Sequence, residues 1–354
     1  MKIVATELKP CVQRQADPDW KFARGTVPAL HGWTLALTDE AGTVGLGYVH
    51  AIPTITTHGE GAKAAADYLT PRLIGCDPAA VNEIMDDVDA ALAGNTSVKA
   101  AIDMALHDLL ARRLGVPLHV LFGGKRRDTI PQGRIVPIKS PADMAAIARG
   151  LVGGGYKMVK VKLSGEIELD IERVAAVRQA IEAKTILTVD PNQTYSAKSF
   201  IRSFSRFEKH DVALVEQPVP AADWKGLALL TRTLPVSVEA DESAGSLADV
   251  ARLVNDGVAD VINIKVTKLG GLRNTLAAVK ICEAGGVVCR MGAAFGPALL
   301  QACSAHVAVT FRKLELPCEL SEHLHLHDDP FTPAAVDNGV MRVPQGNGCG
   351  VTLA

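Results

Sequence analysis

The 354-residue sequence is poor in aromatic side chains, which make up 4% of it. Stacking platforms for nucleic-acid bases depend on such side chains, so no platform of this kind is expected. Lys and Arg total 37, Asp and Glu total 39, and the formal net charge is −2, with no dense basic run. The chain therefore lacks the electrostatic footprint of a nucleic-acid or membrane-surface protein, and we predict neither partner.

Paired cysteines are also missing. The seven cysteines are scattered, and no two of them form a Cys-x-x-Cys pair. This pattern gives no zinc site and is typical of reduced thiols in the cytoplasm, the location we expect. No uncharged apolar stretch reaches the ~18 residues of a membrane span. The nearest, residues 296–311, carries Gln301 and His306 and predicts a buried helix.

The middle of the chain repeats one pattern of organisation, with a period of about 25 residues. Short β-rich runs alternate with helix-like stretches such as residues 142–152, 171–183 and 272–284. The runs are 134–139, 158–162, 186–190, 213–217, 236–241, 261–265, 287–291 and 314–319. Such alternation predicts βαβ units in a parallel sheet, which close most simply into a (β/α)8 barrel. An open doubly wound sheet is the alternative, but its Gly-rich phosphate loop is missing.

The first 125 residues do not share this period and predict an α+β domain. Strands are expected at 2–8, 33–39 and 44–50, and helices at 59–73, 79–93 and 96–114. The last residues, 323–354, are rich in Gly, Pro and Asp and are expected to pack back onto this domain. We therefore predict a capping domain, 1–125 completed by 323–354, and a barrel domain, 126–322.

Carboxylates recur at the predicted carboxyl ends of the barrel strands, where the active sites of such barrels lie. Asp190, Glu216 and Asp241 end three consecutive strands, and neighbouring strands lie about 4.8 Å apart. Three converging carboxylates repel one another unless a cation joins them, and oxygen-only ligands select Mg²⁺ first and Mn²⁺ second. Each carboxylate could instead cap a helix or form an ion pair, but their shared position on three strands favours a metal site.

Lysines occupy equivalent positions on two other strands. Lys160 and Lys162 share a face because strand side chains alternate, and Lys265 ends the strand opposite in an eight-stranded barrel. Lys162 and Lys265 are thus predicted to flank the α-carbon of a bound carboxylate, one removing a proton and the other delivering one. Lys160 and the metal should lower the pKa of the lysine that acts as base. The alternatives are counter-ions to the carboxylates or a Schiff-base lysine.

Taken together, these segments resemble the enolase superfamily in its muconate lactonizing enzyme subgroup, over nearly the whole chain. Lys160-Val161-Lys162 is similar to its K-x-K motif. The segments 190–192, 215–218 and 241–243 are similar to its three Mg²⁺-ligand segments, and 265–271 to the segment with the opposing lysine. The helix at 99–109 is similar to its capping-domain helix. The resemblance implies a modified (β/α)7β barrel, a Lys base with Mg²⁺, and a homo-oligomer.

In this family, substrate choice lies in two capping-domain loops and the last barrel strands. Residues 13–27 would form the first loop, and residues 50–60 the second. The predicted substrate-binding residues are Trp20, Arg24, Asn192, Arg290 and Glu319.

Strand eight departs from the pattern of related dipeptide epimerases. They carry Asp-x-Asp there for the substrate ammonium, whereas this chain has Glu319 and Ser321. This departure argues against an α-amino dipeptide. Glu319 would then hold an amide or amine, or pair with Lys265 or Arg290.

The favoured function is a Mg²⁺-dependent racemase or epimerase acting on a small-molecule carboxylate, most simply an amino-acid derivative. A cycloisomerase or syn-dehydratase would share the half-reaction but use one lysine as base. An inactive ligand-binding barrel and a Schiff-base aldolase are weaker alternatives. The alternating run His323, His325 and His327 predicts an exposed edge strand rather than a transition-metal site.

Overall fold

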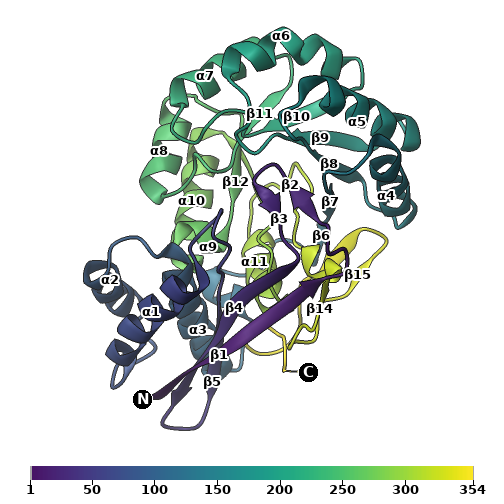
Figure 1. Ribbon diagram of the computed structural model, residues 1–354. Helices are drawn as coiled ribbons and strands as arrows, with labels where there is room; N and C mark the ends of the chain where they lie inside the picture. The colour runs from purple at the N-terminus through teal and green to yellow at the C-terminus, as the bar shows by residue number, and fades with distance from the viewer. Residues whose placement is uncertain (1, 354) are drawn as a thin grey trace.

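A seven-stranded parallel sheet curls through the middle of the chain, with helices over its outer face (Figure 1). The computed structural model describes residues 2–353. The strands, paired in chain order, are β7 (Gly133–Val136), β8 (Met158–Lys162), β9 (Ile186–Asp190), β10 (Val212–Glu216), β11 (Ser237–Ala240), β12 (Val261–Ile264) and β13 (Val288–Met291). The prediction of a parallel barrel is confirmed.

The eighth predicted strand, residues 314–319, is not a regular strand. One parallel bridge joins Cys318 to Gln132. Backbone hydrogen bonds from Gly133 N to Cys318 O (2.7 Å) and from Glu319 N to Met291 O (2.9 Å) link this segment to both edges of the sheet. Pro317 lacks the N–H that a regular ladder would need. The barrel is therefore closed by seven regular strands and this irregular segment, which takes the place of the eighth predicted strand.

Within residues 2–353, seven helices lie on the barrel. They are α4 (Pro141–Gly153), α5 (Ile167–Ala180), α6 (Ala197–Glu208), α7 (Trp224–Thr233), α8 (Leu247–Asn255), the short α9 (Val266–Leu269), and α10 (Leu272–Gly285). Four of them, α4, α6, α7 and α8, begin at a side-chain cap. In α6, Phe200, Phe204 and Phe207 share the buried face at helical spacing. Ser196 caps α6 by accepting from the Ser199 N–H.

An antiparallel sheet with helices forms the α+β part below the barrel (Figure 1). The sheet order is β14-β1-β4-β5, made of β14 (Leu326–His327), β1 (Ile3–Gln15), β4 (Ala29–Asp39) and β5 (Val44–Val49). Its helices are α1 (Gly59–Leu69), α2 (Val81–Ala91) and α3 (Thr96–Leu114), with 3₁₀ turns η1 (Thr70–Leu73) and η2 (Leu118–Phe122). The predicted α+β domain is confirmed.

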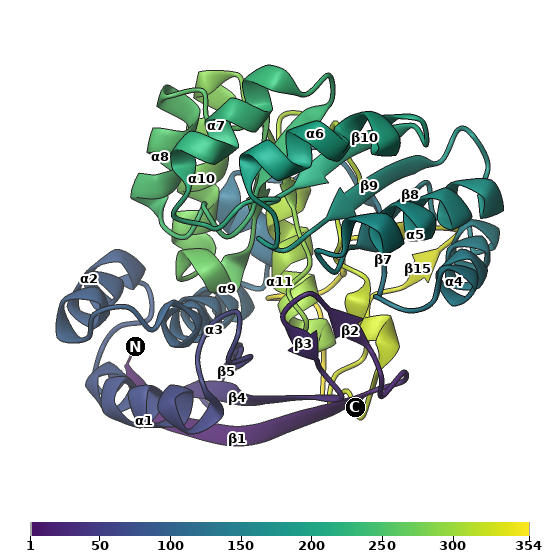
Figure 2. The same cartoon turned by 45° about the horizontal axis from the view of Figure 1, so that its top comes forward.

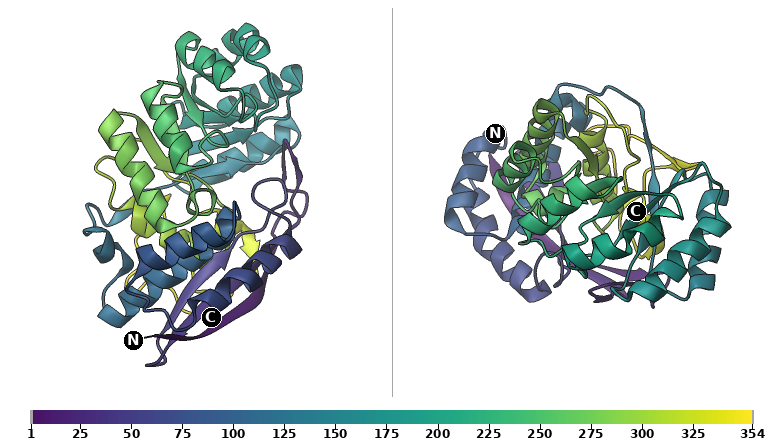
Figure 3. Two further views of the ribbon diagram at one scale, coloured as in Figure 1. Left: turned by 90° about the vertical axis from the view of Figure 1, so that its left-hand side faces the viewer. Right: turned by 90° about the horizontal axis from the view of Figure 1, so that it is seen from above.

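Two buried helices join the parts into one core. α3 lies directly on β5, because a Cβ at Gly47 would stand 2.0 Å from the Ala101 carbonyl oxygen. Every residue of α11 (Ala298–Ala308) is buried, as predicted for residues 296–311. Figure 3 shows the α+β part against one end of the barrel. Within residues 2–353, no helix is long and apolar enough to cross a membrane.

The end of the chain touches both parts. β14, which follows the 3₁₀ turn η3 (Glu322–His325), pairs with β1, while β15 (Val336–Asp337) and β16 (Val340–Arg342) join β6 (Thr129–Pro131). On the basis of these contacts, we propose that the chain has two domains, a capping domain of residues 1–125 with 323–354 and a barrel domain of residues 126–322. A small hairpin, β2 (Lys21–Phe22) and β3 (Gly25–Thr26), projects from the capping part toward the barrel (Figure 2).

Candidate active site

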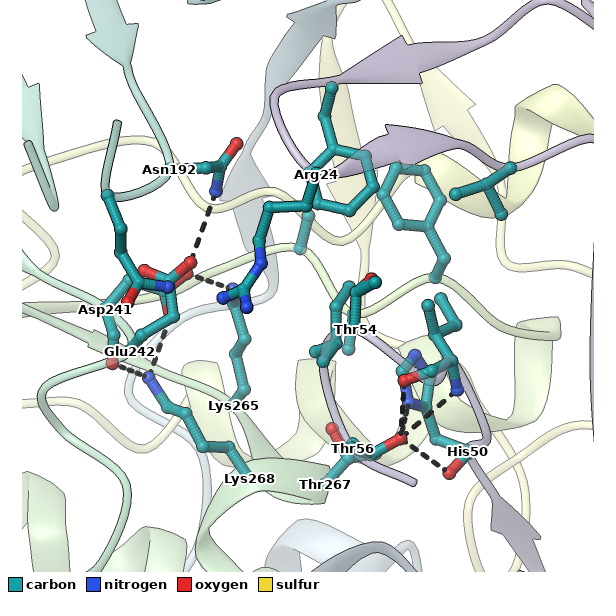
Figure 4. A pocket seen from close by; sticks show the side chains of 18 of the residues that line it. Arg24, His50, Thr54, Thr56, Asn192, Asp241, Glu242, Lys265, Thr267 and Lys268 are labelled. Atoms are coloured by element: carbon teal, nitrogen blue, oxygen red, sulfur yellow. Dashed lines mark hydrogen bonds and ion pairs between the residues drawn. The ribbon is translucent and has the colours of Figure 1, made fainter. Parts of the chain in front are cut away.

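A cavity of about 340 Å³ lies between the barrel and the capping part, a size typical of small-molecule sites. Its floor comes from residues at the carboxyl ends of β8, β9, β11 and β12. Its roof comes from the β2–β3 hairpin and residues 50–56 (Figure 4). The site therefore lies where ligands bind in parallel barrels.

Lys162 lies on one side of this cavity, at the end of β8. Its ammonium donates to Asp190 Oδ2 and to Asn192 Oδ1, the latter at 3.0 Å. The ring of Phe22 lies 5.9 Å from the Lys162 Nζ, measured to the ring centroid. Asn192 also donates its backbone N–H to Asp190 Oδ1 at 2.9 Å. The lysine is thus held by the first predicted metal ligand.

Lys265 enters the same cavity from the end of β12. Its ammonium donates to Asp241 Oδ2 at 2.6 Å. Lys268, one turn further along α9, donates to Asp241 Oδ1 at 2.7 Å and to Asn263 O at 3.0 Å. Both carboxylate oxygens of Asp241 are therefore paired with lysines (Figure 4).

Lys160 lies deeper, at the bottom of the cavity, with 1% of its surface exposed. It donates to Glu216 Oε2 at 2.9 Å and to Glu319 Oε2 at 2.6 Å, and its Nζ is 4.0 Å from Asp190 Oδ2. It thus bridges two of the predicted metal ligands.

Burial and neighbouring charges shift the pKa values of these groups. Burial would lower the pKa of Lys265, but the charges of Asp241 and Glu216 outweigh it and raise that pKa. The charge of Lys160 acts in the expected direction and lowers the pKa of Lys265, but the carboxylate partners outweigh it, and the lowering by Lys160 together with the metal stays a prediction. Burial does lower the pKa of Lys268, against the effect of Asp241.

The residues fit a hard divalent cation in their chemistry. Burial raises the pKa of Glu216, and the charge of Asp190 raises it further, so negative charge is crowded here. Burial also raises the pKa of Glu242, as do Asp241 and Asp190, and its buried Oε2 has no hydrogen-bond partner. Within residues 2–353, no three His, Cys, Asp or Glu side chains are arranged so that they could hold a metal ion directly. Lysine ammonium groups instead pair with the oxygen ligands that Mg²⁺ would need.

The predicted substrate-binding residues fall into two groups. Trp20, Arg24 and Asn192 line the cavity, and Figure 4 shows Arg24 reaching from the hairpin toward its Lys265 side. Arg290 and Glu319 do not line it, and both are fully buried beneath its floor. A substrate could contact Arg290 and Glu319 directly only if the residues that form the bottom of the cavity moved apart.

Sequence reasoning missed three residues of this centre. Glu239 lies two positions before Asp241 on the same strand face, an ionisable residue inside an apolar strand. Lys268 follows Lys265 by one helical turn. Glu242 lines the cavity beside Asp241. The sequence offers two signals for them: strand alternation, which places Glu239 on the same face as Asp241, and the helical spacing between Lys265 and Lys268.

The histidine run does not form the predicted alternating edge strand. Only Leu326–His327 is a strand, β14. His323 is buried in η3, and His325 Nε2 lies 3.2 Å from Glu322 Oε2. The edge-strand interpretation therefore holds for His327 alone, which is exposed.

Comparison with known proteins agrees with this architecture. The N-terminal domain model of mandelate racemase / muconate lactonizing enzyme matches residues 6–123, and the enolase C-terminal domain-like model matches residues 143–354. The chain is 31% identical to an L-Ala-D/L-Glu epimerase of Clostridium acetobutylicum, covering 94% of each chain. It is 32% identical to a chloromuconate cycloisomerase of Delftia acidovorans, covering 88% of this chain and 86% of that one.

A solved structure matches along the whole length. It is the dipeptide epimerase of Enterococcus faecalis V583 complexed with Mg and L-Leu-L-Tyr, with a TM-score of 0.94 and 28% identity. The match covers 99% of this chain and 100% of that one. A capped parallel barrel with lysines and carboxylates at its strand ends thus defines an isomerase of the racemase/epimerase or cycloisomerase kind. The chain belongs to the enolase superfamily, among its muconate lactonizing enzyme-like members.

Proposed function

We propose that this enzyme removes the proton α to a substrate carboxylate and returns a proton to the opposite face, as a Mg²⁺-dependent racemase or epimerase of an amino-acid derivative. One observation carries the proposal. Lys162 and Lys265 line the same cavity from β8 and β12, which are separated by three strands of the curled sheet. Two bases that approach one carbon from different sides are what inversion requires.

Each lysine has a defined task in this scheme. In each direction the neutral lysine on one side of the α-carbon takes its proton and the protonated lysine on the other side delivers one, and Asp190 and Asp241 orient them. A lysine that leaves its carboxylate partner loses the ion pair that favours its charged form, and can then release its proton. Asp190, Glu216 and Asp241 would hold Mg²⁺, which supplies charge stabilisation to the enediolate. The buried position of the site excludes water from the carbanion.

The cavity lining indicates a small anionic substrate. Five cationic side chains line it, against two carboxylates; the cations are Arg24, Lys160, Lys162, Lys265 and Lys268. The relatives named above include epimerases of dipeptides, which contain amino-acid units. The free state of the described cysteines further supports a cytoplasmic enzyme, and we infer a homo-oligomer from the family.

The test follows the α-proton. The purified protein is incubated with Mg²⁺ in D₂O with pools of N-acyl amino acids, dipeptides, betaines and hydroxy acids, and NMR records the α-proton signal. We expect loss of that signal together with formation of the other stereoisomer. Failure to bind Mg²⁺ at millimolar concentration, with no exchange in any pool, would favour an inactive barrel instead.

Cycloisomerisation is the second candidate. It is supported by the 32% identity to the chloromuconate cycloisomerase. It would use the same deprotonation in one direction, with one lysine as acid/base and the other as an electrostatic partner. A new constitutional isomer, rather than the mirror-image product, would identify it in the same NMR experiment, and a dehydrated product would identify the syn-dehydratase.

A further inference from the structure

Gln217 lies directly after Glu216, at the carboxyl end of β10, and has no exposed surface. Its backbone φ is +35°, in the left-handed region that residues with a side chain avoid. Among residues 2–353, seven residues other than glycine have a positive φ, and only Gln193 and Gln217 of these are not Asn or Asp. Both glutamines lie within three residues of a proposed metal ligand, so the backbone strain is concentrated at the site.

The side chain of Gln217 uses its full hydrogen-bonding capacity. Its Oε1 accepts from the backbone N–H of Asp241 at 2.9 Å and from that of Ser243 at 3.0 Å. Its Nε2 donates to Val219 O at 3.0 Å and to Ser243 Oγ at 2.8 Å. A backbone N–H can only donate and a carbonyl oxygen can only accept, so these partners fix one orientation of the amide.

The backbone of Gln217 makes two further hydrogen bonds. Its N–H donates to Glu239 O on β11 at 2.8 Å, and its carbonyl oxygen accepts from the Gln193 N–H, also at 2.8 Å. Gln193 follows Asp190 by three residues, and its Oε1 accepts from the Ala221 N–H at 2.8 Å. The left-handed backbone of Gln217 is therefore hydrogen-bonded on both sides.

One residue thus joins three segments at the carboxyl ends of the consecutive strands β9, β10 and β11. We call them the ligand segments, because each begins with one proposed metal ligand; they are residues 190–193, 216–221 and 241–243. Mg²⁺ demands a near-ideal octahedral geometry, and carboxylates on separate segments meet that demand only if the segments keep their relative positions. Gln217 supplies this constraint without occupying any carboxylate oxygen.

We propose that Gln217 is a positioning residue, whose amide and left-handed backbone hold the three ligand segments at the spacing that a hard divalent cation needs. It is not a ligand itself, because both of its amide atoms already bind protein groups. The inference rests on the proposed function for the identity of the metal ligands. The joining of the segments stands on the contacts alone.

Removal of the amide tests the proposal through the binding of Mn²⁺, followed as the electron paramagnetic resonance signal of free Mn²⁺. Gln217→Ala should weaken Mn²⁺ binding by about tenfold or more, since groups that support metal ligands have effects of this size. The control is Gln345→Ala. Gln345 also donates its amide to a carbonyl two residues away, Val343 O at 2.8 Å, but it is exposed and does not line the cavity. Equal Mn²⁺ affinity in the two folded variants would overturn the positioning role.

Glycine at the same position separates binding from stability. Gln217→Gly lacks the amide, as the alanine variant does, but glycine adopts a φ of +35° without a steric penalty. The glycine variant should therefore unfold at a higher urea concentration than the alanine variant and yet bind Mn²⁺ no more tightly. Recovery of Mn²⁺ affinity together with stability would show that Gln217 acts only through the stability of the fold, and would contradict the proposal. The glycine variant also replaces the alanine variant if the latter fails to fold.

Hydrogen exchange of the metal-free protein measures the joining of the segments directly. Gln217→Ala should speed exchange of the backbone N–H groups of Asp241 and Ser243 by roughly tenfold, because both lose their acceptor. The N–H of Gly133, which donates to Cys318 O where the barrel closes, should exchange as before. Unchanged exchange at Asp241 and Ser243 in the folded variant would show that Gln217 does not hold the segments together.

These outcomes separate the inference from the proposed function. If the unaltered protein binds no Mn²⁺ at millimolar concentration, the metal-dependent function fails and the positioning of metal ligands fails with it. Hydrogen exchange then still decides whether Gln217 joins the segments. If the unaltered protein binds Mn²⁺ and Gln217→Ala binds it equally well, only the role of Gln217 is wrong.

Discussion

Each predicted metal ligand in this enzyme is paired with a lysine. Asp190 binds Lys162, Glu216 binds Lys160, and Asp241 binds both Lys265 and Lys268. These ion pairs lie in a low-dielectric interior, where removing one partner leaves an expensive uncompensated charge. The carboxylates are thus counter-ions for the lysines, and we propose them in addition as the oxygen ligands of Mg²⁺.

Neutralising one of these carboxylates should weaken cation binding. Asp190→Asn removes a charge and a hard oxygen donor, so Mn²⁺ affinity should fall by more than about tenfold, as measured by calorimetry. The matched control is Asp211→Asn, an exposed aspartate with a left-handed backbone (φ 52°) that asparagine also tolerates. Equal Mn²⁺ affinity in the two variants would exclude Asp190 as a ligand.

At this scale, the sequence identified the types of residue better than their contacts. Strand alternation places Lys160 and Lys162 on one face, and both do line the cavity. The same pattern could not show that Arg290 lies under the floor, because its burial depends on Glu239 from a strand two places away in the sheet. Side-chain contacts across the barrel depend on the tertiary structure, so no local pattern in the sequence reveals them.

Among the elements, β5 and α3 show how closely the capping part is packed. A Cβ at Gly47 would stand 2.0 Å from the Ala101 carbonyl oxygen, and backbone cannot yield as a flexible side chain can.

Gly47→Ala should therefore destabilise the protein, by roughly 1–3 kcal/mol or more, in urea unfolding. The control is Gly150→Ala in α4, where an added Cβ meets nothing within 4 Å. That exchange should stabilise the helix by roughly 0.5–1 kcal/mol. Similar effects at both positions would contradict the close approach of β5 to α3.

The elements also show where prediction from sequence ends. The predicted helices 96–114 and 272–284 agree with α3 and α10 to within one residue, and both helices end at a left-handed glycine, which is a local signal. The hairpin β2–β3 was predicted only as a loop. It depends on distant partners, namely the ion pair of Lys139 with Asp17 (2.9 Å) and the hydrogen bond from Ile138 N to Lys21 O.

For the whole molecule, buried histidines make stability depend on pH. Burial lowers the pKa of His306 to about 3, with a further contribution from His119. His306 Nε2 lies 3.1 Å from Cys349 O, and its Nδ1 lies 3.0 Å from His119 Nδ1. A proton on each of the facing nitrogens would leave two donors opposed. Neutral His306 thus joins α11 to the linker η2 and to the end of the chain.

The direction of this pH dependence follows from the difference in proton binding between the folded and the unfolded chain. The unfolded chain binds a proton at His306 below about pH 6.5, whereas the folded chain does not until about pH 3, so stability is lost as the pH falls through that window. Between pH 6 and pH 4, the free energy of unfolding should fall by about 1.4 kcal/mol per pH unit from this group. His306→Gln should remove that part of the slope in urea titrations, and exposed His327→Gln should not. A slope unchanged by His306→Gln would contradict this assignment.

The central claim is that Lys162 and Lys265 serve opposite faces of one carbon, and face-specific exchange tests it most directly. Each enantiomer of a turned-over substrate is incubated in D₂O with Lys162→Ala or Lys265→Ala, and with Lys157→Ala as control, an exposed lysine directly before β8. Each active-site variant should lose racemisation by about 100-fold or more, yet still exchange the α-proton of one enantiomer, a different one for each variant. Full racemisation by either variant, or exchange of the same enantiomer by both, would contradict the two-base site.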